Sequence, residues 1–330
     1  MPAVPPRRRR ALLLVAVIAL AVVAGRTLGD SPSVDGTGPP SRARALAPSS
    51  STTAAPHPTA TIGLASTTTL APVTTTTTTV PFDVFSLRPP APAGDPAGLA
   101  AQIDAAEATL ADPAADEPSV GSAALAQQVG YRQLALHPEW DAALLGAVPA
   151  WLRPFVSKEV AARRHFLAMS DHLTPTPPTM WHIVAPAPLA QLQQDYLDAQ
   201  HATGIPWPYL AAIHLVETST GRIQATSVAG AQGPMQFLPA TWARYGGGGN
   251  ILDTRDAILG AARYLAANGG VADLRGALFH YNHSVHYVEG VILYGDLLAE
   301  EPLALRALWH WGVWYRTASG DVYLPVGYGG

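Results

Sequence analysis

The sequence has no cysteine among its 330 residues and contains a single lysine, Lys158. The absence of cysteine excludes a disulfide framework, a thiolate metal site, a cysteine nucleophile and a lipid attached to a cysteine behind an export signal. A glycine-rich phosphate-binding loop with its lysine is also missing, which argues against P-loop nucleotide chemistry. Packing alone must therefore stabilise the fold.

Charged residues are few, at 13% of the chain, and they are unevenly distributed. Residues 1–80 hold seven arginines against Asp30 and Asp35, whereas residues 81–330 hold thirteen basic and twenty-two acidic residues. A phosphate backbone would be repelled by such an acidic folded part. We therefore expect no nucleic-acid partner.

The N-terminus has the pattern of an export signal. Four arginines at residues 7–10 precede an apolar stretch over residues 11–25. A helix of that length reaches about 22 Å at roughly 1.5 Å per residue, short of the ~30 Å core of a bilayer. Residues 1–30 are predicted to be a signal peptide, with a signal anchor as the alternative, and the rest is expected to be exported and extracytoplasmic.

Residues 31–95 are dominated by Ser, Thr, Pro, Ala and Gly and show no helical or strand periodicity. Such a composition predicts a disordered Ser/Thr/Pro-rich stalk. Because it offers no periodic apolar face, we expect it to be dispensable for chemistry.

After residue 95 apolar residues recur three and four positions apart, so the expected fold class is mainly α. A helical N-terminal subdomain is expected over 96–180 and a second domain over 181–330. A turn at Ser319-Gly320-Asp321 between β-prone flanks predicts a short hairpin within 317–328. The expected helices cover residues 97–111, 121–136, 139–149, 154–171, 187–203, 207–217, 239–245, 254–267, 272–281, 284–299 and 303–316.

Glu217 stands out at the end of the apolar helix expected over 207–217. Leu210, Ile213 and His214 precede it by seven, four and three positions, which places the carboxyl in line with an apolar face. The helix dipole also opposes a negative charge at a C-terminus. Both effects raise the pKa of a carboxyl, as a general acid requires near neutral pH. Taken alone, the helix position would fit a surface glutamate at a frayed helix end better, and the motifs that follow change that balance.

Two further motifs follow this helix. One is a polar, glycine-punctuated loop, Ser227-Val228-Ala229-Gly230-Ala231-Gln232-Gly233-Pro234-Met235-Gln236, and the other is Leu278-Phe279-His280-Tyr281-Asn282. With Glu217-Thr218, they resemble the lytic transglycosylases of the lysozyme-like superfamily, in particular the exported actinobacterial type. The family pattern is Glu-Ser, then Ser-x-x-Gly-Ala-x-Gly-x-Met-Gln, then Ala-Tyr-Asn. Thr218 replaces the usual Ser and keeps the hydroxyl, whereas His280 replaces the usual Ala.

The resemblance implies a lysozyme-like helical catalytic domain over 181–330 that cuts peptidoglycan glycan strands. Glu217 would protonate the oxygen between N-acetylmuramic acid and N-acetylglucosamine. It would then deprotonate the O6 hydroxyl that closes a 1,6-anhydro ring. Only one carboxylate is then needed, in agreement with the spacing of Asp253 and Asp256, which predicts helix capping.

The resemblance also assigns the sugar-binding residues. Tyr281 would hydrogen-bond Glu217, and the subsites would be lined by Thr218, Met235, Gln236 and Asn282. Each has a structural alternative: core packing for Met235, a helix C-cap for Asn282 and a buried aromatic for Tyr281.

We expect no cofactor and no metal. The histidines at 280, 283 and 286 would not share one helix face, and no acidic residue lies between them. The membrane is an expected partner only through an N-terminal anchor, and the sequence does not indicate an oligomeric state. Two alternatives stay open: a muramidase that hydrolyses the same bond, and a non-catalytic peptidoglycan-binding protein.

Overall fold

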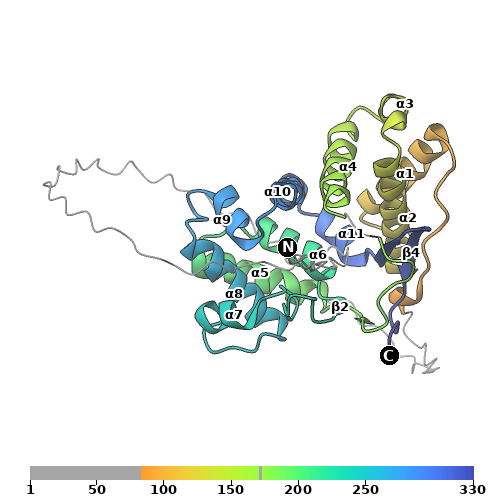
Figure 1. Cartoon of the computed structure of the whole chain (residues 1–330). Helices are drawn as coiled ribbons and strands as arrows, with labels where there is room; N and C mark the ends of the chain where they lie inside the picture. The colour runs from red at the N-terminus through yellow and green to blue at the C-terminus, as the bar shows by residue number, and fades with distance from the viewer. Residues whose placement is uncertain (1–82, 171–172) are drawn as a thin grey trace, which may run out of the picture. The chain divides into compact units, whose positions relative to one another are not determined.

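The computed structural model describes residues 83–170 and 173–330 (Figure 1). The expected signal and most of the expected stalk lie outside these residues. The described part of the chain is mainly helical with short strands, which confirms the predicted fold class. Within it, no helix is both long and apolar enough to cross a membrane.

The first group of helices lies between residues 96 and 168. Asp95 caps the first of them by accepting hydrogen bonds from Ala97 N and Gly98 N, and Asp116 caps the second. The first helix packs against the second and third, and the second packs against the fourth. The helices are α1 (Pro96–Ala111), α2 (Glu117–Leu136), α3 (Asp141–Ala147) and α4 (Arg153–Ala168).

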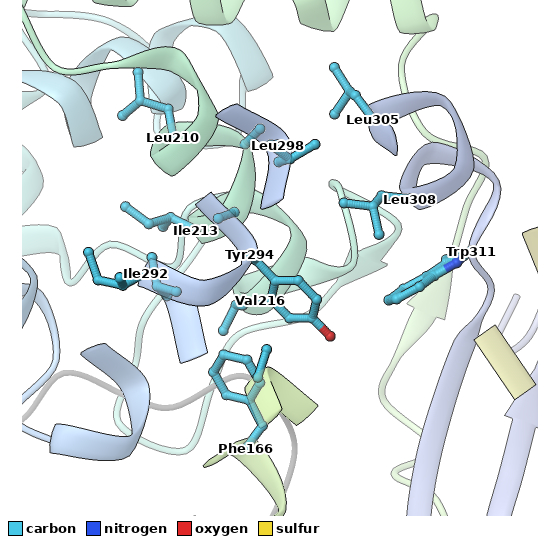
Figure 2. Close-up of a cluster of buried hydrophobic side chains, with 14 of the residues drawn as sticks. Phe166, Leu210, Ile213, Val216, Ile292, Tyr294, Leu298, Leu305, Leu308 and Trp311 are labelled. Carbon is cyan, nitrogen blue, oxygen red and sulfur yellow. The ribbon is translucent and has the colours of Figure 1, made fainter. Parts of the chain in front are cut away.

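The second group of helices packs onto the first. Helix α10 lies against both α4 and α6, so that Phe166, Val216 and Tyr294 belong to one buried cluster (Figure 2). The expected boundary near residue 180 therefore does not divide the hydrophobic core. The helices are α5 (Leu189–Thr203), α6 (Trp207–Thr218), α7 (Pro239–Tyr245), α8 (Thr254–Ala267), α9 (Leu274–Tyr281), α10 (Val285–Glu300) and α11 (Ala304–His310).

Two short antiparallel strand pairs complete the described fold. Strand β1 (His182–Ile183) pairs with β2 (Ile223–Gln224), and β3 (Val313–Thr317) pairs with β4 (Gly320–Leu324). The C-terminal hairpin was predicted, but the helix expected over 303–316 was wrong beyond His310. Residues 313–317 alternate between buried and partly exposed positions, which is the period of a strand.

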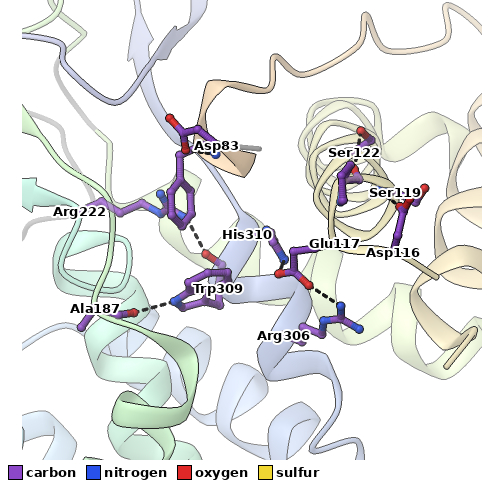
Figure 3. Close-up of polar contacts among 12 residues, drawn as sticks. Asp83, Asp116, Glu117, Ser119, Ser122, Ala187, Arg222, Arg306, Trp309 and His310 are labelled. Atoms are coloured by element: carbon purple, nitrogen blue, oxygen red, sulfur yellow. Dashed lines mark hydrogen bonds and ion pairs between the residues drawn. The ribbon is translucent and has the colours of Figure 1, made fainter. Parts of the chain in front are cut away.

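Residues 83–95 correct the expected extent of the disordered stalk. A short 3-10 helix, η1 (Val84–Ser86), begins after the capping residue Asp83. The Phe85 ring lies edge-on against Trp309 at 5.2 Å, and the Arg222 guanidinium lies 4.8 Å from the Phe85 ring centre. Figure 3 shows Arg222 and Trp309 near the capping residue Asp83. One aromatic anchor produces no periodic pattern, which is why the sequence did not reveal it.

Removing these residues is expected to lower the thermal stability. A chain that begins at Asp95 loses the partly buried side chains of Val84, Phe85 and Leu87, worth about 1–3 kcal/mol together. For a domain of this size that corresponds to roughly 2–10 °C in Tm. Calorimetry of chains that begin at Asp83 and at Asp95 measures the difference, and identical melting temperatures would contradict the docking of η1.

Candidate active site

Helix α6 carries Glu217 into the protein interior. Pro208 lies in its first turn, and Leu210 and Ile213 are fully buried on the face that leads to Glu217, whose exposed fraction is 1%. The helix ends abruptly because Ser219 and Thr220, at φ +51° and +62°, adopt left-handed conformations. The carboxyl is thereby fixed at the last turn of a buried helix.

The surroundings of Glu217 favour its protonated form. Burial raises the pKa of Glu217 to about 8, and a hydrogen bond from the Tyr287 hydroxyl to Oε1, 2.7 Å long, opposes the rise in pKa. The other oxygen, Oε2, has no hydrogen-bond partner among the described residues. The carboxyl group therefore holds a proton at neutral pH and has one oxygen left for a ligand.

His214 lies one turn before Glu217 and does not counteract this effect. Its Nδ1 is 2.8 Å from the Tyr196 hydroxyl, and burial lowers the pKa of His214 to about 3. A neutral imidazole supplies no positive charge that would favour ionisation of the neighbouring carboxyl.

A cavity of about 370 Å³ opens beside Glu217. Among the described residues that line it, Glu217 is the only ionisable carboxyl group, and hydroxyl and apolar side chains form most of the wall. The lining residues are Thr174, Thr176, Pro177, Pro178, Thr179, Met180, Trp181, Glu217, Thr218, Ile223, Ala225, Thr226, Ser227, Val228, Gln236 and Tyr315.

The loop over residues 227–237 is held against the end of α6. The Thr218 hydroxyl donates to Pro234 O at 2.6 Å and accepts from Gly221 N at 3.1 Å. Within the loop, the backbones of Gln232 and Phe237 bond to each other in both directions at 2.9 Å. These bonds fix the wall of the cavity relative to Glu217.

The residues assigned to the sugar subsites separate into two groups. Thr218 and Gln236 line the cavity with Glu217. Met235, Tyr281 and Asn282 do not line it and are at most 3% exposed. Met235 belongs to the core and Asn282 occupies the C-cap position of α9. These are the structural positions that the sequence offered as alternatives to sugar binding.

The expected hydrogen bond between Tyr281 and Glu217 is wrong. The Tyr281 hydroxyl donates to Met235 O at 2.6 Å, and the Tyr287 hydroxyl takes the place next to the carboxyl. The two tyrosine rings are stacked with centroids 6.4 Å apart. Tyr287 lies in the first turn of α10, a place that no local motif in the sequence marked as functional.

Asp253 has the helix-capping role that the sequence predicted. Asp253 accepts from Asp256 N at 3.0 Å and caps α8, which confirms the structural reading of these two aspartates. In residues 83–170 and 173–330, no three histidine, aspartate or glutamate side chains are grouped as a metal site would require.

Part of the cavity wall was not foreseen. Tyr315 on β3 contributes from the C-terminal hairpin, and its hydroxyl lies 2.6 Å from Thr174 Oγ1. Both residues are distant in sequence from the motif loop, so only tertiary structure brings them to the site.

Two comparisons with known proteins find similarity to transglycosylases. Residues 196–289 match the family described as Transglycosylase SLT domain. Over 81 residues the chain is 41% identical to the Membrane-bound lytic murein transglycosylase F of Thiobacillus denitrificans (strain ATCC 25259 / T1). That alignment covers 24% of this chain and only 17% of the relative. No solved structure matches the chain significantly.

Proposed function

We propose that the protein is a peptidoglycan lytic transglycosylase, because residues 196–289 match the transglycosylase SLT domain family. It cleaves the β-1,4 bond between N-acetylmuramic acid and N-acetylglucosamine and leaves 1,6-anhydromuramic ends. The observation that supports this most strongly is a single buried carboxyl group, Glu217, in a cavity where no second carboxyl is present among the described lining residues.

The chemistry follows from that single group. Ordinary glycosidases place two carboxyl groups across the scissile bond, and the second one activates water or attacks the sugar. Here Glu217 first donates its proton to the glycosidic oxygen. Its carboxylate then accepts the O6 proton of the same muramic residue while that oxygen bonds to C1. An internal nucleophile has a high effective concentration and needs no positioned water.

The cavity residues have separate proposed roles. Gln236 lines the cavity and is proposed to contact the glycan. Thr218 lines it as well, but it is fully buried and its hydroxyl bonds to Pro234 O and Gly221 N, so it is proposed to hold the wall in place. Met235, Tyr281 and Asn282 are proposed to position the wall from behind, because they are buried and do not line the cavity.

Action outside the cytoplasmic membrane is part of the proposal. The basic and apolar pattern of residues 1–30 supports export, and the polar composition up to residue 82 supports a spacer before the domain. The assignment to an actinobacterial type stays a prediction.

The proposal is tested by digesting purified sacculi and measuring the masses of the released muropeptides by mass spectrometry. Products with 1,6-anhydromuramic ends are expected, because ring closure is the step that a lone carboxyl group can complete. Reducing ends would instead identify a muramidase, and intact sacculi that retain the bound protein would identify a binding protein.

Replacing Tyr287 with phenylalanine is expected to slow cleavage several-fold and to move its pH profile. The lost hydrogen bond is worth about 0.5–1.5 kcal/mol. Since that bond lowers the pKa of Glu217, its loss raises this pKa further above 8. Activity needs the protonated carboxyl and falls as pH rises through its pKa, so the alkaline limit should move to higher pH.

Tyr281→Phe is the matched control for this experiment. Its hydroxyl bonds to Met235 O rather than to the carboxyl, so the alkaline limit should stay near the wild-type value. Initial rates from pH 5 to 10 for the wild type, Tyr287→Phe and Tyr281→Phe measure the alkaline limit of each protein. An unchanged profile for Tyr287→Phe would contradict its place beside Glu217.

A further inference from the structure

A second cavity lies outside the region that matches the SLT family. Its volume is about 480 Å³, and it shares no lining residue with the cavity at Glu217. Residues from α1, α2, α4, α10 and α11 contribute to it. The lining residues are Glu107, Leu110, Ala111, Gln127, Trp151, Leu152, Pro154, Phe155, Lys158, Leu297, Glu300, Glu301, Leu303, Ala304, Arg306 and Ala307.

Glu107 gives this cavity a buried carboxyl group. The residue is 8% exposed, and its Oε1 accepts hydrogen bonds from Gln127 Nε2 at 2.8 Å and from the Tyr131 hydroxyl. Trp311 Nε1 donates to Gln127 Oε1 at 2.9 Å and thereby fixes the orientation of that amide. Glu107 Oε2 accepts no hydrogen bond from any described residue, and no cation within the described chain pairs with this carboxyl.

A second buried carboxyl group, Glu159, interacts electrostatically with Glu107. Glu159 is 1% exposed, and neither of its oxygens has a hydrogen-bond partner among the described residues. Burial, followed by the charge of Glu107, raises the pKa of Glu159, while Arg163 opposes this effect. Burial also raises the pKa of Glu107. A cation bound at Glu107 would favour the ionised form of this carboxyl group, which burial alone disfavours.

The basic residues at the rim do not supply this cation. Lys158 pairs with Glu300, and Arg306 pairs with Glu117. Two exposed apolar side chains also line the cavity, since Trp151 and Leu303 expose 65% and 84% of their surface. Large apolar side chains that stand exposed beside a cavity are typical of a binding surface.

We propose that this cavity binds a peptide through a primary ammonium group carried on an aliphatic side chain. The ammonium donates to Oε2 of Glu107, the methylene groups lie between Leu152, Phe155 and Leu297, and Trp151 covers the peptide backbone. If the proposed function holds, the diamino acid in the peptides of peptidoglycan belongs to this ligand class. The cavity would then hold the peptide while the distant carboxyl cuts the glycan.

The test measures peptide binding without any cleavage, so it does not depend on the proposed enzymatic activity. The probes are acetyl-Ala-Lys-Ala-amide and the same peptide acetylated at the lysine Nζ, titrated into the purified protein by NMR and calorimetry. Only the free amine is expected to bind. Glu107→Gln should weaken that binding at least tenfold, and Trp151→Ala should weaken it several-fold.

Leu252→Ala is the matched surface control, because Leu252 is 64% exposed and lines neither cavity. It should leave binding unchanged. Thermal unfolding of each variant shows that it is folded, and Trp151→Ala tests the site even if Glu107→Gln is unstable. Equal binding of both probes, or full binding by Trp151→Ala and Glu107→Gln, would overturn the proposal. So would a dimer in sedimentation that Trp151→Ala converts to a monomer, since a second copy would then occupy the cavity.

Discussion

Glutamine in place of Glu217 should abolish the release of anhydromuropeptides from sacculi. The amide keeps the shape of the carboxyl and can still accept the hydrogen bond from Tyr287, but it cannot donate the proton that the leaving oxygen needs. General acid catalysis alone contributes about 10²–10⁴-fold, and the same group also acts as the base in ring closure. Mass spectrometry of the anhydromuropeptides released during a long digestion measures the remaining activity.

The same substitution should also change how the free energy of unfolding depends on pH. This change distinguishes a folded, inactive variant from an unfolded one. The pKa of Glu217 is about 8 in the folded protein, against an ordinary value of 4.5. Between these pH values the folded state binds more protons than the unfolded state, so the free energy of unfolding falls as pH rises, by up to about 1.4 kcal/mol per pH unit. Glutamine does not titrate, so the free energy of unfolding of Glu217→Gln does not fall in this way. Relative to wild type, the variant should become progressively more stable from pH 4.5 to 8.

Asp253→Asn serves as the control for activity. Asp253 caps α8 and lies outside the lining of the cavity, and asparagine is an equally good capping residue. Cleavage should therefore persist in this variant. Turnover by Glu217→Gln, or its loss only in Asp253→Asn, would require another catalytic acid.

The sequence located the acid because the evidence for it is local. Glu217 sits in register with apolar residues of one helix, and the motif loop follows ten residues later, so the helix period and the order of the motifs sufficed. The partner of the carboxyl could not be found in this way. Tyr281 and Tyr287 both reach the same region, and only the packing of α9 and α10 decides that Tyr287 contacts Glu217 and Tyr281 contacts Met235.

The two errors in the fold have different causes. Residues 313–317 follow a helix and carry no breaker, yet pairing with β4 makes them a strand. Phe85 lies in a polar, proline-containing segment whose composition predicts disorder, and its fixed position depends on Trp309 and Arg222. The partners that fix Phe85 lie at sequence distances that no local pattern encodes. Strand β4, in contrast, follows β3 directly, and the β-branched and aromatic residues of 313–317 are themselves a local signal for a strand.

The motif loop offers a second test with a large effect, in which two glycines of the same loop are compared. Gly233 and Gly230 both adopt left-handed conformations, at φ +72° and +85°. A Cβ atom at Gly233 would lie 1.9 Å from the backbone oxygen of Ile251, whereas a Cβ at Gly230 would meet no atom within 4 Å. Alanine at Gly230 therefore carries the cost of the left-handed conformation alone, about 1–2 kcal/mol.

Gly233→Ala should in addition displace the loop, because a backbone oxygen cannot rotate away as a side chain can. The loop carries Pro234 O, which accepts from Thr218, and Gln236, which lines the cavity beside Glu217. A displacement of 1 Å at a reacting centre can reduce the rate by about 10²-fold. We expect Gly233→Ala to lose at least that much activity and about 3 kcal/mol or more of stability, while Gly230→Ala keeps most of its activity. Sacculus digestion and thermal unfolding of both variants measure these effects, and equal behaviour of the two would show that the close approach of Gly233 to Ile251 does not shape the site.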